Sequence, residues 1–256
     1  MPPRLPPRAI SRPCRSSTPV HGLARVLSKR GICSRSQGER LVREGRVRVN
    51  GRVVRDPEFP IAGNERIDVD GGEAQAAVPV YIVMNKPRGL VVSASDERGR
   101  DTVYSLIEGA ALPWLGPVGR LDRASEGLLL LSNDTVWAAG ITDPATHVPK
   151  TYHVQVAGHP DDATIAAMLD GLDDAGERLR AGAASVLRRG EKNAWLQVTL
   201  DEGRNRHIRR LMAALGFDVQ RLVRVAIGEL VLGELAKGQW RHLTAGEVAM
   251  LRRRAH

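Results

Sequence analysis

The chain has 256 residues, 42% of them hydrophobic and 26% charged, which is ordinary for a globular protein large enough to bury a sizeable core. No apolar run approaches the roughly 20 residues of a membrane-spanning helix, and two cysteines, Cys14 and Cys33, are too few for a disulfide framework or a zinc site. The net charge of +9 lies at one end: residues 1–55 contain 14 Lys or Arg and 2 Glu, a net +12, which leaves −3 for the rest. This segregation predicts a polyanion-binding part on a nearly neutral body, in a reducing cytoplasm.

Residues 1–21 are expected to form a disordered tail. They are rich in proline and arginine, contain no acidic residue and offer little apolar surface to bury. An organelle transit peptide is the alternative interpretation, but the density of proline disfavours the amphipathic helix that such a peptide forms.

A first short helix is predicted directly after this tail. Leu23, Val26 and Leu27 recur at helical spacing, and Gly31 stands where a left-handed residue ends a helix. Ser34 followed by Gln37 is the signature of a capping box, which predicts the start of a second helix. Basic side chains lie along both predicted helices: Arg25, Lys29, Arg30, Arg35, Arg40 and Arg43.

A small sheet is expected to follow the helix pair. Alternating valines surround Asn50-Gly51, the strongest short signal for a hairpin turn, and residues 66–69 supply one more strand. Residues 23–54, in this order of elements, resemble the alpha-L RNA-binding module known from a small-subunit ribosomal protein. The resemblance implies that the basic helix surface grips structured RNA, whereas a generic basic helix pair is the alternative. We therefore predict an RNA-binding module over residues 22–72 and a linker over 73–79.

Residues 80–251 are expected to form one larger domain. Strands are predicted at residues 80–84, 127–132, 151–156, 194–200 and 219–227, and helices near residues 102–107, 161–172 and 205–215. Because strands and helices mix without strict alternation, the pattern predicts an α+β fold with a largely antiparallel, mixed sheet flanked by helices.

Asp122 is the most notable candidate for chemistry in this domain. It lies in residues 118–127, a loop bounded by glycines and followed by the apolar run of residues 128–131. A rigid strand behind a loop is a good scaffold for a reactive side chain. On physical grounds alone, an aspartate in such a loop more often caps or turns the backbone through local hydrogen bonds.

Four segments together resemble the RsuA/RluB-type ribosomal RNA pseudouridine synthases. Residues 119–134 are similar to the catalytic motif of this family, residues 85–89 to its opening motif, residues 150–152 to its tyrosine motif, and residues 202–210 to its C-terminal arginine motif. The segments stand in family order, and the resemblance spans about residues 22–250. His207 departs from the pattern, since glutamine is expected there, and this concerns substrate contacts more than activity.

The resemblance implies that Asp122 acts as nucleophile or base when a uridine is isomerised, a reaction that uses no metal, nucleotide or redox cofactor. A carboxylate in a partly dry site stays ionised more easily beside a cation, and Arg209 is assigned to that place. On a continuous helix, Ile208 belongs to an apolar stripe and Arg209 to its flank, whereas Arg206 and Arg210 point away from the stripe.

Tyr152 is implied to stack on the target uracil and to help move the proton at C5, with cross-strand packing as the alternative. For Arg120 two roles are open: it fills the space that the extruded base leaves, or it holds the loop. Further RNA contacts are expected from Lys86, Arg204, Arg206 and Arg210.

We predict a cytoplasmic, monomeric enzyme that isomerises a uridine of ribosomal RNA. The sequence Gly-Arg-Asn-Arg at residues 203–206 favours large-subunit RNA as the substrate. The competing hypothesis is a non-catalytic RNA-binding or ribosome-assembly factor, because the basic module alone would bind RNA. No membrane or metal partner is expected.

Overall fold

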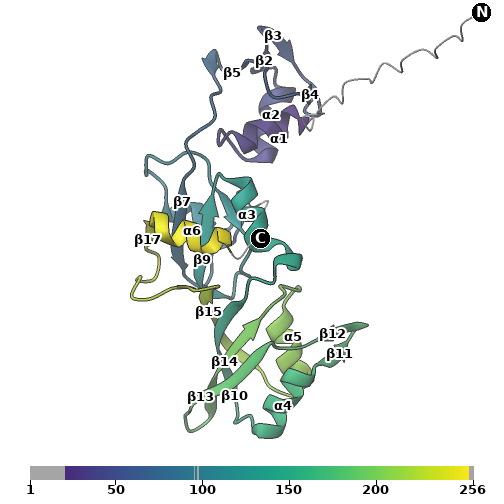
Figure 1. Cartoon of the computed structure of the whole chain (residues 1–256), viewed down its shortest axis with the longest axis vertical. Coiled ribbons are helices and arrows are strands. Elements are labelled where there is room, and N and C mark those ends of the chain that lie inside the picture. The colour runs from purple at the N-terminus through teal and green to yellow at the C-terminus, as the bar shows by residue number, and fades with distance from the viewer. Residues whose placement is uncertain (1–20, 95, 97, 254–256) are drawn as a thin grey trace, which may run out of the picture. The chain divides into compact units, whose positions relative to one another are not determined.

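Figure 1 shows the computed structural model of the chain, which describes residues 21–94, 96 and 98–253. The disordered tail predicted for residues 1–21 lies, apart from His21, outside the described residues. The chain divides into two compact units: Met1–Leu27 with Arg35–Gln75 form the N-terminal unit, and Ser28–Ser34 with Ala76–His256 form the C-terminal unit. Residues 28–34 thus belong to the C-terminal unit, although they lie inside the predicted RNA-binding module.

The N-terminal unit contains most of the first helix, the second helix and the hairpin that the sequence predicts. Its strands form a four-stranded sheet with the order β3-β2-β5-β6, and β1 pairs separately with β4. The elements are α1 (Leu23–Lys29), α2 (Arg35–Arg43), β1 (His21–Gly22), β2 (Val47–Val49), β3 (Arg52–Val54), β4 (Pro60–Ile61), β5 (Ile67–Val69) and β6 (Gly72–Glu73). Asn50 and Gly51 both adopt positive φ, 49° and 80°, as a tight two-residue hairpin requires. Because β6 reaches Glu73, the predicted linker begins inside the sheet.

The C-terminal unit is built on a nine-stranded sheet. Seven strands follow the order β13-β14-β10-β15-β9-β7-β17, while β16 pairs with β15 and β8 with β9. β15 and β9 run parallel, and the other pairings are antiparallel. The strands are β7 (Tyr81–Lys86), β8 (Gly116–Val118), β9 (Glu126–Ser132), β10 (Lys150–Ala157), β13 (Ala183–Arg189), β14 (Asn193–Leu200), β15 (Val219–Ile227), β16 (Leu230–Val231) and β17 (Trp240–His242). The predicted α+β fold with a largely antiparallel mixed sheet is confirmed.

Helices flank this sheet. α4 and α5 pack on one face of β10 and β14, together with the small hairpin of β11 and β12, whereas α3 and α6 lie near β7 and β9 (Figure 1). The remaining elements are η1 (Val103–Leu106), α3 (Thr135–Thr142), η2 (Pro144–Thr146), α4 (Asp162–Asp170), β11 (Leu172–Asp174), β12 (Glu177–Leu179), α5 (His207–Ala214) and α6 (Ala245–Arg253). The helix predicted near residues 102–107 is a single 3-10 turn, and the sequence analysis missed α3 and α6.

β9 is the central buried strand of the unit, and every one of its residues is buried. Leu128 and Leu130 pack into one core cluster, while Leu129 and Leu131 pack into another on the opposite face of the sheet. A strand covered on both faces reads as a continuous apolar run rather than an alternating one. This explains the leucine run and gives the loop of Asp122 a rigid element behind it.

Gly127 lies at a close approach between the backbones of β9 and β15. Its φ is 101°, and a Cβ atom there would overlap the backbone carbonyl oxygen and nitrogen of Arg224. Neither group can move without disturbing the parallel pairing of Arg224 with Gly127. Glycine is therefore required at this position by both conformation and space.

We expect Gly127→Ala to lower the free energy of unfolding by about 3 kcal/mol or more, because the backbone overlap adds to the strain of positive φ. Gly89→Ala is the matched control: Gly89 has a φ of 103°, but its Cβ would meet no atom within 4 Å. Strain alone should cost that variant about 1 kcal/mol. Urea unfolding of both variants tests this, and equal losses would show that close strand packing is not the cause.

Candidate active site

Asp122 lies on a loop that is held at several points while its own side chain stays open. The backbone N–H of Ser125 donates to the Asp122 carbonyl at 2.9 Å, and Gly89 and Arg123 exchange hydrogen bonds of 2.8 and 3.0 Å. The neighbouring Leu121 is buried, whereas the Asp122 side chain is 41% exposed. The loop thus presents a carboxylate from a fixed backbone, as predicted from the sequence.

Lys86 is one of the groups that fix this loop. It is fully buried at the end of β7, and its Nζ donates to the carbonyl of Ser125 at 2.8 Å and to that of Pro87 at 3.0 Å. Burial lowers the pKa of Lys86 to about 8, although Glu126 and Asp122 favour its charged form. The prediction that Lys86 contacts RNA is therefore wrong, because its ammonium group cannot reach the surface.

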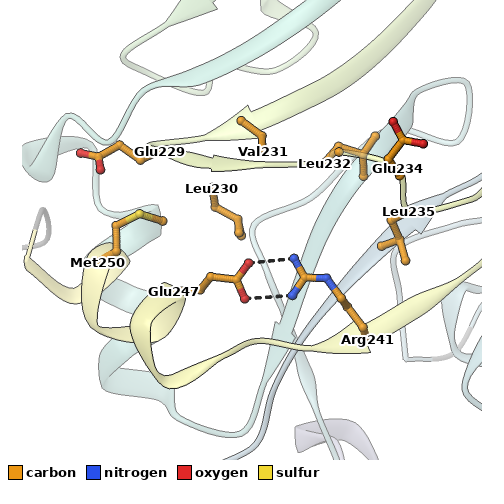
Figure 2. Close-up of a pocket in the computed structure, with 10 residues that line it drawn as sticks. Glu229, Leu230, Val231, Leu232, Glu234, Leu235, Arg241, Glu247 and Met250 are labelled. Carbon is orange, nitrogen blue, oxygen red and sulfur yellow. Dashed lines mark hydrogen bonds and ion pairs between the residues drawn. The ribbon is translucent and has the colours of Figure 1, made fainter.

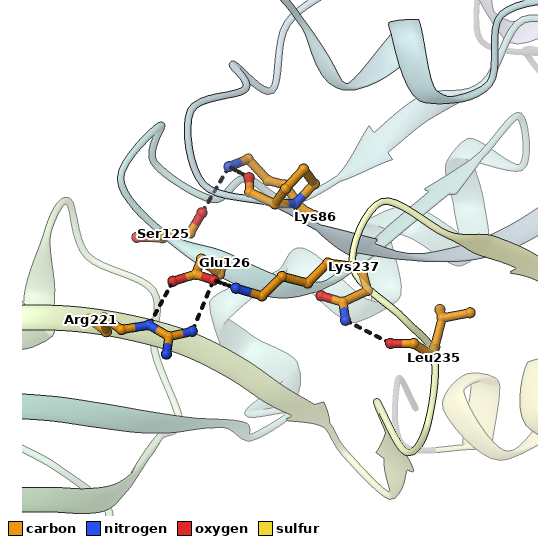
Figure 3. Close-up of polar contacts among 8 residues, drawn as sticks. Lys86, Ser125, Glu126, Arg221, Leu235 and Lys237 are labelled. Atoms are coloured by element: carbon orange, nitrogen blue, oxygen red, sulfur yellow. Dashed lines mark hydrogen bonds and ion pairs between the residues drawn. The ribbon is translucent and has the colours of Figure 1, made fainter.

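Glu126, the first residue of β9, carries a second set of polar contacts that the sequence analysis missed (Figure 3). Its carboxylate accepts two hydrogen bonds of 3.1 Å from Arg221 and one of 2.5 Å from Lys237. Burial by itself would raise the pKa of Glu126, but these hydrogen bonds hold it below its ordinary value. The available signal was an acidic residue at the start of a buried strand, which needs cationic partners.

The cation at ion-pair distance from Asp122 is Arg206, with Nη1 at 3.9 Å from Oδ2. The sequence analysis had assigned this place to Arg209, and the reason for the difference is local. α5 begins at His207, and Arg206 before it adopts left-handed backbone angles, with φ 49° and ψ 31°. Its side chain therefore leaves the helical course that placed it opposite the apolar stripe, and it comes to the loop instead.

Arg209 is half-buried, and its side chain binds backbone carbonyl groups, one of which belongs to the loop of Asp122. Its guanidinium donates to the carbonyl of Val219 at 2.9 Å and, more weakly, to that of Ala124 at 3.4 Å. Burial and repulsion by Arg206 lower the pKa of Arg209, while attraction to Asp122 opposes this. Arg209 thus lies within the electrostatic reach of Asp122 and ties α5, β15 and the loop together.

Two other arginines of the C-terminal motif have acidic partners within the protein. Arg210 forms ion pairs of 2.5 Å with both Asp174 and Glu177, so its guanidinium supports the β11–β12 hairpin, and its predicted contact with RNA stays a prediction. Arg204 lies 2.9 Å from Glu202 and stays one-third exposed.

Tyr152 stands opposite Val198 of β14 and Arg224 of β15, and packs against two core clusters. It shares a pocket of about 360 Å³ with Asp122. The structure thus brings together five of the residues predicted from separate motifs: Arg120, Asp122, Tyr152, Arg204 and Arg206. The other lining residues include His207, Lys150 and Arg224.

His207 has an unusual environment in the wall of this pocket. It is 3% exposed, and neither ring nitrogen makes a hydrogen bond of good geometry within the described residues, although the backbone of Arg180 lies close enough to raise its pKa slightly. Burial, more than the neighbouring charges, lowers its pKa below the usual 6.5. The imidazole is therefore neutral and chemically similar to the glutamine amide expected there, since both offer one donor side and one acceptor side.

This burial predicts a pH-dependent stability. Because the folded pKa is depressed, the unfolded chain takes up the proton first, so stability is full above about pH 6.5 and falls as the pH drops below it. We expect His207→Gln to lose less unfolding free energy than the wild type between pH 7.5 and 5. His159→Gln, at an exposed position, should behave as the wild type. Urea unfolding at both pH values measures this, and identical losses in all three proteins would contradict it.

A second pocket, of about 470 Å³, lies near β16 and α6 (Figure 2). Its lining is largely aliphatic, and Arg241 is paired with Glu247 at 2.7 and 2.9 Å. It contains no residue of the four motifs, so we place the candidate active site at the pocket of Asp122, although that pocket is smaller. Within the described ranges, no cluster of His, Cys, Asp or Glu could hold a metal ion, and no helix has the length and apolar character to cross a membrane.

Comparisons with known proteins agree with the motifs. Residues 80–214 match the family model described as RNA pseudouridylate synthase, and residues 22–67 match the S4 domain. An uncharacterized RNA pseudouridine synthase of Aquifex aeolicus is 37% identical, covering 89% of this chain and 92% of the relative. Ribosomal large subunit pseudouridine synthase B of Bacillus subtilis is 35% identical, covering 90% and 95%. A crystal structure of a pseudouridylate synthase superposes with a TM-score of 0.63 at 31% identity, covering 90% and 99%.

Proposed function

Because the chain belongs to the RNA pseudouridylate synthase family, we propose that it isomerises one uridine of ribosomal RNA to pseudouridine in the cytoplasm, with Asp122 as the catalytic carboxylate. The observation that carries this proposal is the single pocket in which an open Asp122, a cation at 3.9 Å and Tyr152 converge. The relative from Bacillus subtilis, named for the large ribosomal subunit, supports large-subunit RNA as the substrate.

The reaction breaks the bond between N1 of uracil and C1′ of ribose, turns the base, and joins C5 to C1′. The proton of C5 is then lost, and N1 regains one, so no atom is gained or lost overall. Asp122 must be ionised to attack either ribose or base, and Arg206 and Arg209 supply positive charge beside it. Tyr152 lines the same pocket, which supports the proposal that it stacks on the base and assists at C5.

A target uridine in folded RNA must leave its stack before it can reach this pocket. Stacking on Tyr152 recovers part of the cost, about 1–3 kcal/mol per base. Arg120 lines the same pocket, which supports the proposal that it occupies the space that the extruded base leaves. A monomer is sufficient for this chemistry, because all of these groups come from one chain.

Mapping of pseudouridines across both ribosomal RNAs, in cells with and without this gene, tests the proposal. We expect one site to disappear without the gene and to return with the wild-type chain but not with Asp122→Asn. Unchanged maps would favour the competing function, a non-catalytic RNA-binding factor.

We propose that the N-terminal unit anchors the RNA electrostatically. Arg25, Arg35, Arg40 and Arg43 are exposed on its helices. Three of them form ion pairs of 3.2 to 3.8 Å with glutamates, but such surface pairs are weak. A deletion of residues 1–72 would also remove residues 28–34 of the C-terminal unit, so charge substitution is the cleaner experiment.

Replacing these four arginines by Gln should weaken binding and reduce the slope of log affinity against log salt by about 3 to 4, since each phosphate contact contributes about 0.7 to 0.9. Replacing the same four by Lys is the control, because it keeps the charge and should keep the slope. Turnover at saturating RNA should change little in either variant. An unchanged slope in the Gln variant would mean that these helices are not the anchor.

A further inference from the structure

Two cationic side chains flank Tyr152 in the active-site pocket, and the reaction described above uses neither. Lys150 precedes Tyr152 by two residues on β10, so both side chains project from the same face of the strand. Arg224 stands on β15 directly opposite Tyr152. Lys150 and Arg224 both line the pocket that contains Asp122.

Arg224 is a buried guanidinium whose bonding is incomplete. It is 4% exposed, its Nε donates to the carbonyl of Leu128 at 2.7 Å, and its Nη2 has no hydrogen-bond partner within the described residues. No carboxylate of the described chain lies within 4.0 Å of it. An uncompensated buried charge is costly, so packing alone is a poor reason for an arginine here.

Lys150 adds a second charge to the same place. Its Nζ donates to the carbonyl of Ile141 at 3.1 Å, in the last turn of α3, and is otherwise without a close acidic partner in the part of the chain described. Burial and repulsion by Arg224 lower the pKa of Lys150 to about 8, and attraction to Asp201 offsets only part of this. A lysine that merely capped α3 would explain one hydrogen bond, but not its position beside another cation.

Two neighbouring cations in a partly dry pocket form a receptor for an anion. RNA brings such an anion with every nucleotide. We propose that Lys150 and Arg224 form a subsite that binds a backbone phosphate adjacent to the target uridine. With the base stacked on Tyr152 and the phosphate held beside it, the ribose between them is fixed relative to Asp122.

This inference rests on the proposed function for the identity of the anion, but it can be tested separately. Inorganic phosphate, added to the full-length protein at constant ionic strength, should raise the melting temperature. The rise should be lost in Lys150→Gln and retained in Lys150→Arg. Lys192→Gln, which removes an exposed lysine from the turn between β13 and β14, is the matched control and should keep the rise. An undiminished rise in Lys150→Gln would overturn the subsite, whatever the pseudouridine maps show.

A second measurement uses RNA fragments that contain the mapped uridine and carry one uncharged methylphosphonate on its 5′ or its 3′ side. We expect one of the two substitutions to weaken binding to the wild type by about ten- to hundredfold. The same methylphosphonate should weaken RNA binding to the Lys150→Gln variant by less than about twofold. In that variant the phosphate charge has already lost the Lys150 ammonium group as its partner. Equal affinity of the wild type for all three RNAs would contradict the proposal even if Lys150→Gln failed to fold. If the methylphosphonate reduced the affinity of a folded Lys150→Gln variant as much as that of the wild type, the proposal would be contradicted as well.

Discussion

Asp122→Asn should abolish pseudouridine formation, with a loss of about a thousandfold or more, while folding and RNA affinity stay close to those of the wild type. The substitution keeps the shape of the side chain but removes the charge that attack on ribose or base requires. The loop itself should persist, because Lys86, Arg123 and Arg209 hold its backbone rather than the carboxylate. Single-turnover release of the C5 proton from labelled RNA measures the effect.

Asp201→Asn is the matched control, since Asp201 is another carboxylate in the wall of the same pocket. It should keep activity within about tenfold of the wild type, because the proposed reaction gives it no role. Turnover by Asp122→Asn within tenfold of the wild type would remove Asp122 from the chemistry, and the binding-factor hypothesis would then gain weight.

Arg209→Ala should have the second largest effect, a loss of about a hundredfold in turnover. The substitution removes positive charge near Asp122 and also the hydrogen bonds to Val219 and Ala124 that join α5 and β15 to the loop. Arg209→Lys should recover little activity, because an ammonium group cannot reproduce the two directed bonds of a guanidinium. Turnover at saturating RNA distinguishes this loss from weaker binding.

Arg206→Ala tests the other cation by comparison. Its ion pair with Asp122 spans 3.9 Å, and 53% of the Arg206 side chain is exposed. We therefore expect a smaller loss of turnover than in Arg209→Ala, and a still smaller one at high salt. If Arg206→Ala lost more activity than Arg209→Ala, the direct ion pair would matter more than the support of the loop.

The hairpin of the N-terminal unit and the buried strand behind the Asp122 loop could both be predicted from the sequence. Asn50-Gly51 places a hairpin because few other residues accept positive φ at both positions. The leucine run of residues 128–131 marks a strand buried on both faces, and the loop before it presents Asp122. These are local properties, since they depend on backbone preference and on how much apolar surface a short segment must bury.

The partners of the charged side chains could not be predicted from the sequence, because they depend on tertiary packing. Arg206 takes the place at Asp122 that was expected for Arg209, because Arg206 adopts left-handed backbone angles just before α5. Lys86 donates to the loop carbonyl of Ser125 from inside the core. Arg210 forms an ion pair with Glu177 of a hairpin more than 30 residues away in sequence. Arg224 is buried because β15 lies between β9 and β10, and this packing leaves its Nη2 without a hydrogen-bond partner in the part of the chain described. Long cationic side chains reach several ångströms in many directions, so their partners depend on which distant strands and helices pack beside them.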